Sequence, residues 1–188
     1  MGNLKWLLIA VVIFLGLYFV MQSQQSGHTT QSNRIFPEQT ENIAKLVFEK
    51  AGETLTLTKQ DSTWSIVGHD SLTVKADRIE ALFSQSFGVE RETLMTQKSD
   101  NWSKYSVDDA TGTHIKVFDA SEVELVHAIL GQSKSDWARN YVRVGDAPEV
   151  FLTNNNVLNQ FSTDATYWGQ KPPEPEPVVL DSGGVMGQ

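Results

Sequence analysis

Three residues of the segment "ARNYVRV" have the spacing of a binding surface. Arg139, Tyr141 and Arg143 are two positions apart, so in a strand their side chains share one face. Guanidinium groups beside an aromatic ring could hold an anionic ligand or the acidic surface of a partner. Arg143→Glu would then abolish binding without unfolding the protein. The alternative is a solvated outer face with cross-strand ion pairs to Glu122 or Glu124.

Aromatic residues offer a second kind of binding site. Trp102 and Tyr105 lie in a polar segment, and Trp137 follows later in the chain. They could line a concave pocket for a small molecule or a glycan, or cover the core as lids. The candidate binding residues are therefore Arg139, Tyr141, Arg143, Trp102 and Tyr105.

Patterns typical of catalysis or metal binding are missing from the sequence. There is no G-x-S-x-G motif, and "GGVMG" lies in a tail rather than between a strand and a helix. Adjacent carboxylates at Asp108 and Asp109 belong to a turn and point apart, unlike a glycosidase pair. The histidines are scattered at positions 28, 69, 114 and 127, so we expect structural roles, with His114 and His127 in strands that could bring them face to face. We predict no enzyme activity, no cofactor and no metal ligands.

Composition narrows the possible partners. The chain of 188 residues has no cysteine, which excludes disulfides and thiolate chemistry, and its net charge is −8. A surface of that charge repels phosphate backbones, so nucleic acid is not an expected partner.

The N-terminus reads as a membrane anchor. Residues 6–21, "WLLIAVVIFLGLYFVM", carry no charge, and Leu4 extends the apolar segment past Lys5 to nearly the length of a spanning helix. Bulky residues at its end argue against the alternative, a cleaved signal peptide. Lys5 precedes the segment and the next basic residue is Arg34, so we expect a single-pass inner-membrane protein with a cytoplasmic N-terminus and a periplasmic C-terminal domain.

Alternating apolar residues predict strands in the remainder. They occur at 43–49, 55–57 and 64–66, then at 89–94, and then in "HIKVFD", "VELVHAIL", "ARNYVRV" and "EVFLT". Ile79, Leu82, Phe83 and Phe87 follow a helical spacing that ends at Gly88. These patterns predict an α+β fold: antiparallel β-meander sheets with one packed amphipathic helix, preceded by a single N-terminal transmembrane helix.

Four regions follow from these patterns. Residues 1–21 are the anchor, 22–35 a polar flexible tether, 36–168 the folded domain, and 169–188 a tail rich in proline, glutamate and glycine.

The motifs together resemble a known family. The runs "LTLTK…WSI", "KADRIEALF", "YSVDD", "AILGQS" and "NYVR…EVFL", from Ile43 to Thr153, resemble the uncharacterised bacterial DUF4340 family. In that family a Tyr-Gly-Leu segment is common where this chain has "YSV" at Tyr105–Val107. The resemblance implies a membrane-anchored envelope protein, often associated with ABC-transporter components similar to those of gliding motility.

We therefore expect a membrane-anchored periplasmic accessory protein without catalytic activity, an auxiliary subunit of an ABC-transporter-like envelope complex. Its partners would be the membrane, through the N-terminal helix, and other inner-membrane or periplasmic proteins. The alternatives are a periplasmic binding module for a small molecule or glycan, and an enzyme of unrecognised type.

Overall fold

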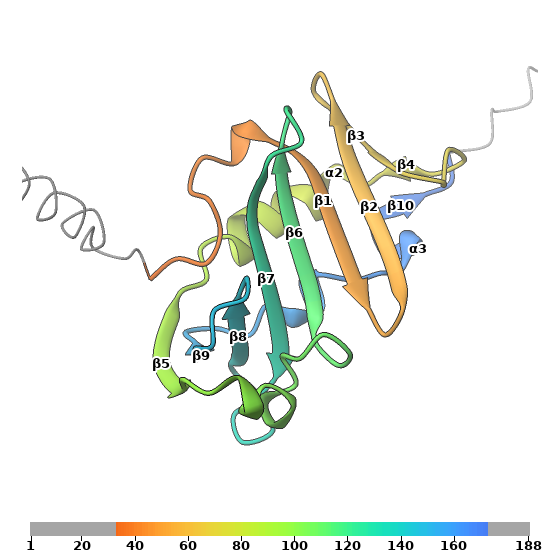
Figure 1. Cartoon of the computed structure of the whole chain (residues 1–188). Helices are drawn as coiled ribbons and strands as arrows, with labels where there is room; N and C mark the ends of the chain where they lie inside the picture. The colour runs from red at the N-terminus through yellow and green to blue at the C-terminus, as the bar shows by residue number, and fades with distance from the viewer. Residues whose placement is uncertain (1–32, 173–188) are drawn as a thin grey trace, which may run out of the picture. The chain divides into compact units, whose positions relative to one another are not determined.

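One antiparallel sheet of eight strands dominates the structure, a computed structural model that describes residues 33–172. Its strands lie in the order β3-β2-β1-β6-β7-β8-β9-β5 (Figure 1). Their bounds are β1 Ile43–Lys50, β2 Glu53–Gln60, β3 Thr63–Ile66, β5 Arg91–Thr96, β6 Thr113–Asp119, β7 Glu124–Gln132, β8 Asn140–Val144 and β9 Val150–Thr153. A separate pair consists of β4, Thr73–Val74, and β10, Gly169–Gln170.

Tight turns and register place the apolar residues on one face. Ala51 and Gly52 both have positive φ angles, 52° and 85°, as a two-residue hairpin turn between β1 and β2 requires. Leu46 then pairs with Leu57 of β2 and with Val117 of β6. Because side chains alternate along a strand, these residues point to the same side of the sheet and are buried there.

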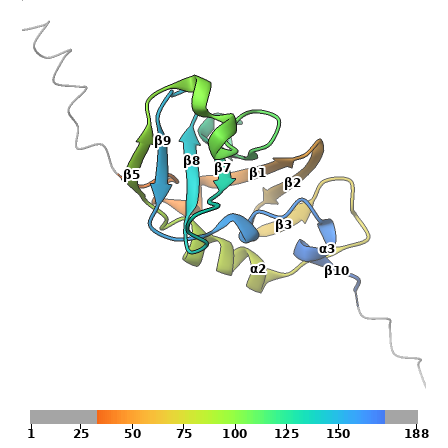
Figure 2. The ribbon, with the colours of Figure 1, turned by 90° about the horizontal axis from the view of Figure 1, so that it is seen from below.

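Short helical segments cover this first face (Figure 2). They are α2 Ala76–Ala81, the π-helical turn η2 Leu82–Ser86, η5 Leu158–Gln160 and α3 Ala165–Trp168; a further helical turn, η1 Thr40–Asn42, precedes β1 and has no buried residue. Trp168 is fully buried, and its ring stacks on Phe48 of β1 at 5.4 Å between centroids. Phe161 also contacts Phe48, at 5.6 Å. Residues distant in sequence therefore build one main core.

The opposite face of the sheet is covered over only part of its width. Residues 97–112, here called the 97–112 loop, contain the short helices η3 Ser99–Asn101 and η4 Ser103–Tyr105. Tyr105 and Val107 pack with Ile129 of β7 and Tyr141 of β8 in a second apolar cluster. Over β3, β2, β1 and β6, no helix or loop of residues 33–172 crosses this face (Figure 1).

The predicted α+β fold class is wrong. Residues 33–172 form mostly antiparallel sheet, and their helices are few and short. The predicted amphipathic helix is only six residues of α-helix, followed by five π-helical residues. A π turn brings residues five apart together, which buries both Leu82 and Phe87.

No helix within residues 33–172 has the length and apolar character needed to cross a membrane. The transmembrane helix predicted for residues 1–21 lies outside the described residues, as does most of the predicted tether. Ile35, assigned to the tether, is buried, and Arg34 forms a bridge with Glu90. Gly169 and Gln170, assigned to the tail, pair with β4; residues 173–188 lie outside the described part.

Candidate functional site

Arg143, a predicted binding residue, is buried beneath the 97–112 loop. Tyr141 and Arg143 share a strand face, as their spacing predicts. That face is covered, however, and Arg143 is only 2% exposed. Nε donates to the carbonyl of Val107 at 2.9 Å, and Nη1 donates to the carbonyl of Gly145 at 2.7 Å. Nη2 donates to a carboxylate oxygen of Asp109 at 2.7 Å. Each of the three guanidinium nitrogens therefore already donates to an acceptor within the protein.

Of the predicted aromatic residues, Trp102 stacks on this arginine, and Tyr105 and Tyr141 pack with each other. The guanidinium carbon of Arg143 lies 3.8 Å from the centre of the Trp102 ring, and the Trp102 Nε1–H donates to the carbonyl of Pro148 at 3.3 Å. Tyr105 and Tyr141 meet edge to face at 4.8 Å, and both are buried. The structure thus brings four of the five predicted residues together, but as a structural cluster that fastens the 97–112 loop to the sheet.

This fastening depends on a close backbone approach. A Cβ atom at Gly131 of β7 would overlap the carbonyl oxygen of Tyr105 and lie 2.7 Å from that of Ser106. Ser106 has a φ angle of 54°, in the left-handed region that favours glycine. That backbone conformation carries a steric cost for serine that glycine at this position would not have.

Arg139, the fifth predicted residue, lies apart from the other four. It precedes β8, and its guanidinium pairs with Glu92 at 2.7 Å and with Asp136 at 3.2 Å. The predicted alternative, pairing of the arginines with Glu122 or Glu124, is also wrong, since Glu122 pairs with Lys45. Trp137 is 72% exposed and takes no part in the Arg143 cluster.

Next to Asp109, the structure brings two histidines into contact. The Nδ1 atom of His114 on β6 and the Nε2 atom of His127 on β7 are 3.0 Å apart. The Nε2 atom of His114 lies 3.3 Å from the backbone carbonyl of Asp109. His114 is 9% exposed and His127 is half-buried. The expectation that these two strand residues face each other is confirmed.

A polar pocket of about 480 Å³ opens beside the histidines. The β1–β2 turn, part of the 97–112 loop, and Asp146, which follows β8, surround it. Lys116 and Glu49 line it as an ion pair at 2.9 Å. We call this cavity, with His114 and His127, the histidine pocket.

The surroundings of His127 favour its neutral form. Burial lowers the pKa of His127 below its ordinary value, and the ring of His114 lowers that pKa further. Glu124 raises the pKa, whereas the positive charges of Lys116 and Arg143 lower it. Within residues 33–172, no group of three or more His, Cys, Asp or Glu side chains is placed to hold a metal ion.

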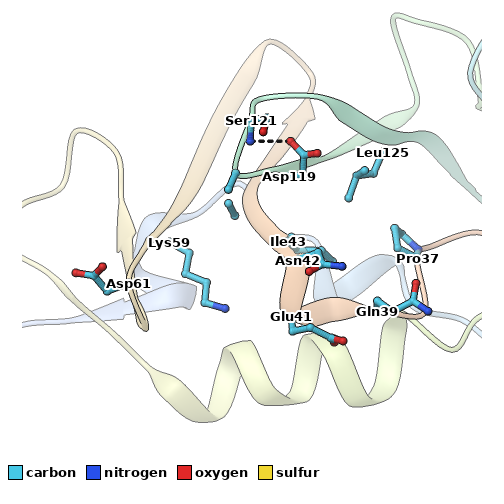
Figure 3. A pocket seen from close by; sticks show the side chains of 12 residues that line it. Pro37, Gln39, Glu41, Asn42, Ile43, Lys59, Asp61, Asp119, Ser121 and Leu125 are labelled. Carbon is cyan, nitrogen blue, oxygen red and sulfur yellow. Dashed lines mark hydrogen bonds between the residues drawn. The ribbon is translucent and has the colours of Figure 1, made fainter.

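A second pocket, of about 590 Å³, lies at another end of the sheet (Figure 3). Asp119 is drawn there with its carboxylate accepting the backbone N–H of Ser121 at 2.8 Å, so this side chain serves a turn. Leu125, 40% exposed, adds an apolar wall. The other charged side chains drawn in Figure 3 lie apart from one another, and this pocket lacks the converging polar atoms of the histidine pocket.

The sequence reasoning missed the role of Asp109, which it treated as a turn residue. Asp108 does serve the turn, because its carboxylate accepts the backbone N–H groups of Ala110 and Thr111. Asp109 instead reaches back to Arg143 with its side chain and to His114 with its carbonyl oxygen. The sequence indicated that the two adjacent aspartates point apart. It did not indicate the partners of Asp109, which lie 34 positions away at Arg143 and 5 positions away at His114.

Comparison with known proteins finds a match to a family model. The model of a family described as a domain of unknown function, DUF4340, matches residues 64–174, more than half of the chain. The match begins in β3 and includes the 97–112 loop, both histidines and Arg143. No curated protein and no solved structure matches the chain.

Proposed function

The chain belongs to the DUF4340 family, a domain of unknown function, and on that premise we propose that it is a membrane-anchored periplasmic interaction protein without catalytic activity. The partners are other inner-membrane or periplasmic proteins, in the role of an auxiliary subunit of an ABC-transporter-like envelope complex. The uncharged apolar sequence at residues 6–21 supports attachment to the membrane, with the folded part outside the cytoplasm.

The observation that carries this proposal is the uncovered sheet face over β3, β2, β1 and β6. Its central row contains Thr56, Val47 and Lys116, which are neighbours across the strands. These side chains are half-buried, and Phe118 of the next row is half-buried too. This face mixes hydroxyl, aliphatic, ammonium and aromatic groups, and of these the aromatic ring of Phe118 is of a type enriched at protein interfaces.

The sheet edges are less suited to binding a partner. The edge strand β3 has only four residues, and the other edge strand, β5, pairs with β9 through two register shifts. Short or irregular edge strands oppose the addition of another strand. Docking through the uncovered face is therefore favoured over strand addition.

Photo-crosslinking in cells tests this proposal. A photoreactive amino acid at Thr56, on the uncovered face, should yield a stoichiometric crosslink to a membrane or periplasmic protein. The matched control is the same amino acid at Glu80, an exposed position on α2 that faces away from the sheet. Equal labelling at both positions, or no crosslinked partner at Thr56, would reject docking through this face.

A further inference from the structure

Two imidazole nitrogens converge on one point of the histidine pocket. His114 Nδ1 and His127 Nε2 are 3.0 Å apart, with ring centroids 5.2 Å apart. The two residues come from adjacent strands, β6 and β7, paired through six positions. Their backbone positions are therefore set by the sheet and not by a flexible loop.

The hydrogen bonds define which nitrogens carry protons. The carbonyl of Asp109 can only accept, so its contact with His114 Nε2 requires a proton on that nitrogen. In the neutral ring, Nδ1 of His114 then holds a lone pair directed at His127, whose Nε2–H donates to it. A histidine whose far nitrogen donates to a carbonyl is the usual arrangement of a metal-binding histidine.

We propose that His114 and His127 together bind one transition-metal ion of the class that imidazole favours, Zn²⁺, Cu²⁺ or Ni²⁺. With metal–nitrogen bonds of about 2.0–2.1 Å, a tetrahedral ion holds two ligand nitrogens about 3.3 Å apart. The two nitrogens need to separate by only a few tenths of an ångström, and the rings turn so that both lone pairs point to the ion. The proton of His127 Nε2 moves to Nδ1, so that both rings remain neutral ligands.

The pocket supplies the remaining requirements of such a site. It is open to solvent, so water or a partner's side chain completes the coordination. Asp146 lines the same cavity and contributes negative charge, while the carboxylate of Asp109 is paired with Arg143 and the charge of Lys116 is paired with Glu49. The site rests on the His114–His127 geometry alone and does not depend on the proposed docking role.

Copper and zinc binding to the full-length protein in detergent tests the site. We expect one Cu²⁺ per chain, with an electron paramagnetic resonance spectrum showing splitting from two imidazole nitrogens. H127Q and H114Q should each weaken Cu²⁺ and Zn²⁺ binding at least about tenfold, because each removes one of two protein ligands. H69Q is the matched control and should bind as the unmodified protein does, since His69 lies in an exposed turn.

The variants remain informative if one of them misfolds. His127 is half-buried, so H127Q is expected to keep the circular dichroism spectrum of the parent. The nitrogen splitting is measured on the unmodified protein and needs no variant. Binding that persists in the folded H114Q/H127Q protein, or Cu²⁺ without two imidazole nitrogens, would overturn the assignment.

Discussion

The guanidinium carbon of Arg143 lies 3.8 Å from the centre of the Trp102 ring, and this contact joins the sheet to the 97–112 loop. The arginine is on β8, and the tryptophan lies between η3 and η4. Stacking on the ring leaves the edges of the guanidinium free to donate to Val107, Gly145 and Asp109. One side chain thus fixes the loop that shapes one wall of the histidine pocket.

Replacing Arg143 should destabilise the protein rather than only remove a binding group. Arg143→Met leaves the carbonyls of Val107 and Gly145 without their donor, at a cost of about 2–4 kcal/mol in the free energy of unfolding. Arg139→Met is the control, since its partners are solvent-exposed carboxylates and the expected cost is below about 1 kcal/mol. Urea denaturation measures both. Equal stability of the two variants would contradict the bracing role of Arg143.

The close approach at Gly131 predicts a steric effect. Gly131→Ala places a methyl group against the carbonyl oxygens of Tyr105 and Ser106, which should cost about 1–3 kcal/mol through displacement of the loop. Gly88→Ala is the matched control, because nothing lies within 4 Å of its added Cβ and its expected effect is within about 0.5 kcal/mol. Thermal unfolding of both variants measures the difference in their stability. A Gly131→Ala protein as stable as the unmodified protein would show that the 97–112 loop moves away from the added methyl group without cost.

Ser106 offers a stabilising substitution. Its φ angle of 54° is unfavourable for a residue with a side chain, by about 1 kcal/mol or more, and glycine removes that cost. Glycine also increases the entropy of the unfolded chain, so we expect Ser106→Gly to gain about 0.5 kcal/mol net. Ser103→Gly, within the helical turn η4, should instead lose stability. Chemical denaturation measures whether the two substitutions change the stability in opposite directions. A loss of stability at both positions would refute the left-handed conformation of Ser106.

Asp108 predicts a pH dependence. The hydroxyl of Thr111 donates to its carboxylate, and this hydrogen bond lowers the pKa of Asp108 below its ordinary value; backbone N–H groups of Ala110 and Thr111 add to the effect. The folded state therefore binds fewer protons than the unfolded state. This contribution to stability is present above about pH 4 and is lost as the pH falls through the folded-state pKa.

Thr111→Val should raise the pKa of Asp108 towards its ordinary value and weaken the loss of stability in acid. Carboxyl-carbon NMR titration measures the pKa directly. Thr166→Val is a parallel control, because Thr166 lowers the pKa of Asp164 through the same kind of hydrogen bond and should leave Asp108 unchanged. An unaltered Asp108 titration in Thr111→Val would exclude the hydroxyl as the main cause.

Local patterns predicted the strands well, because each strand carries its own signal. Leu55 and Leu57 alternate with threonines in β2, and both leucines are buried. Ala51 and Gly52, between the strands predicted at 43–49 and 55–57, form the turn that joins them. The helix at Ile79 is present, but its π-helical continuation was not predicted, since an i, i+3, i+4 spacing also describes an ordinary helix.

The sequence by itself determined that Tyr141 and Arg143 share a strand face, because side chains alternate in every strand. Only the tertiary structure decided that this face is covered by the 97–112 loop, that Asp109 reaches Arg143, and that His114 meets His127. Side chains alternate in the same way along a strand whether the face they point to is solvated or covered, so alternation does not distinguish the two cases. The difference lies in contacts between residues far apart in the chain, which arise from the strand order and from the space that Gly131 leaves.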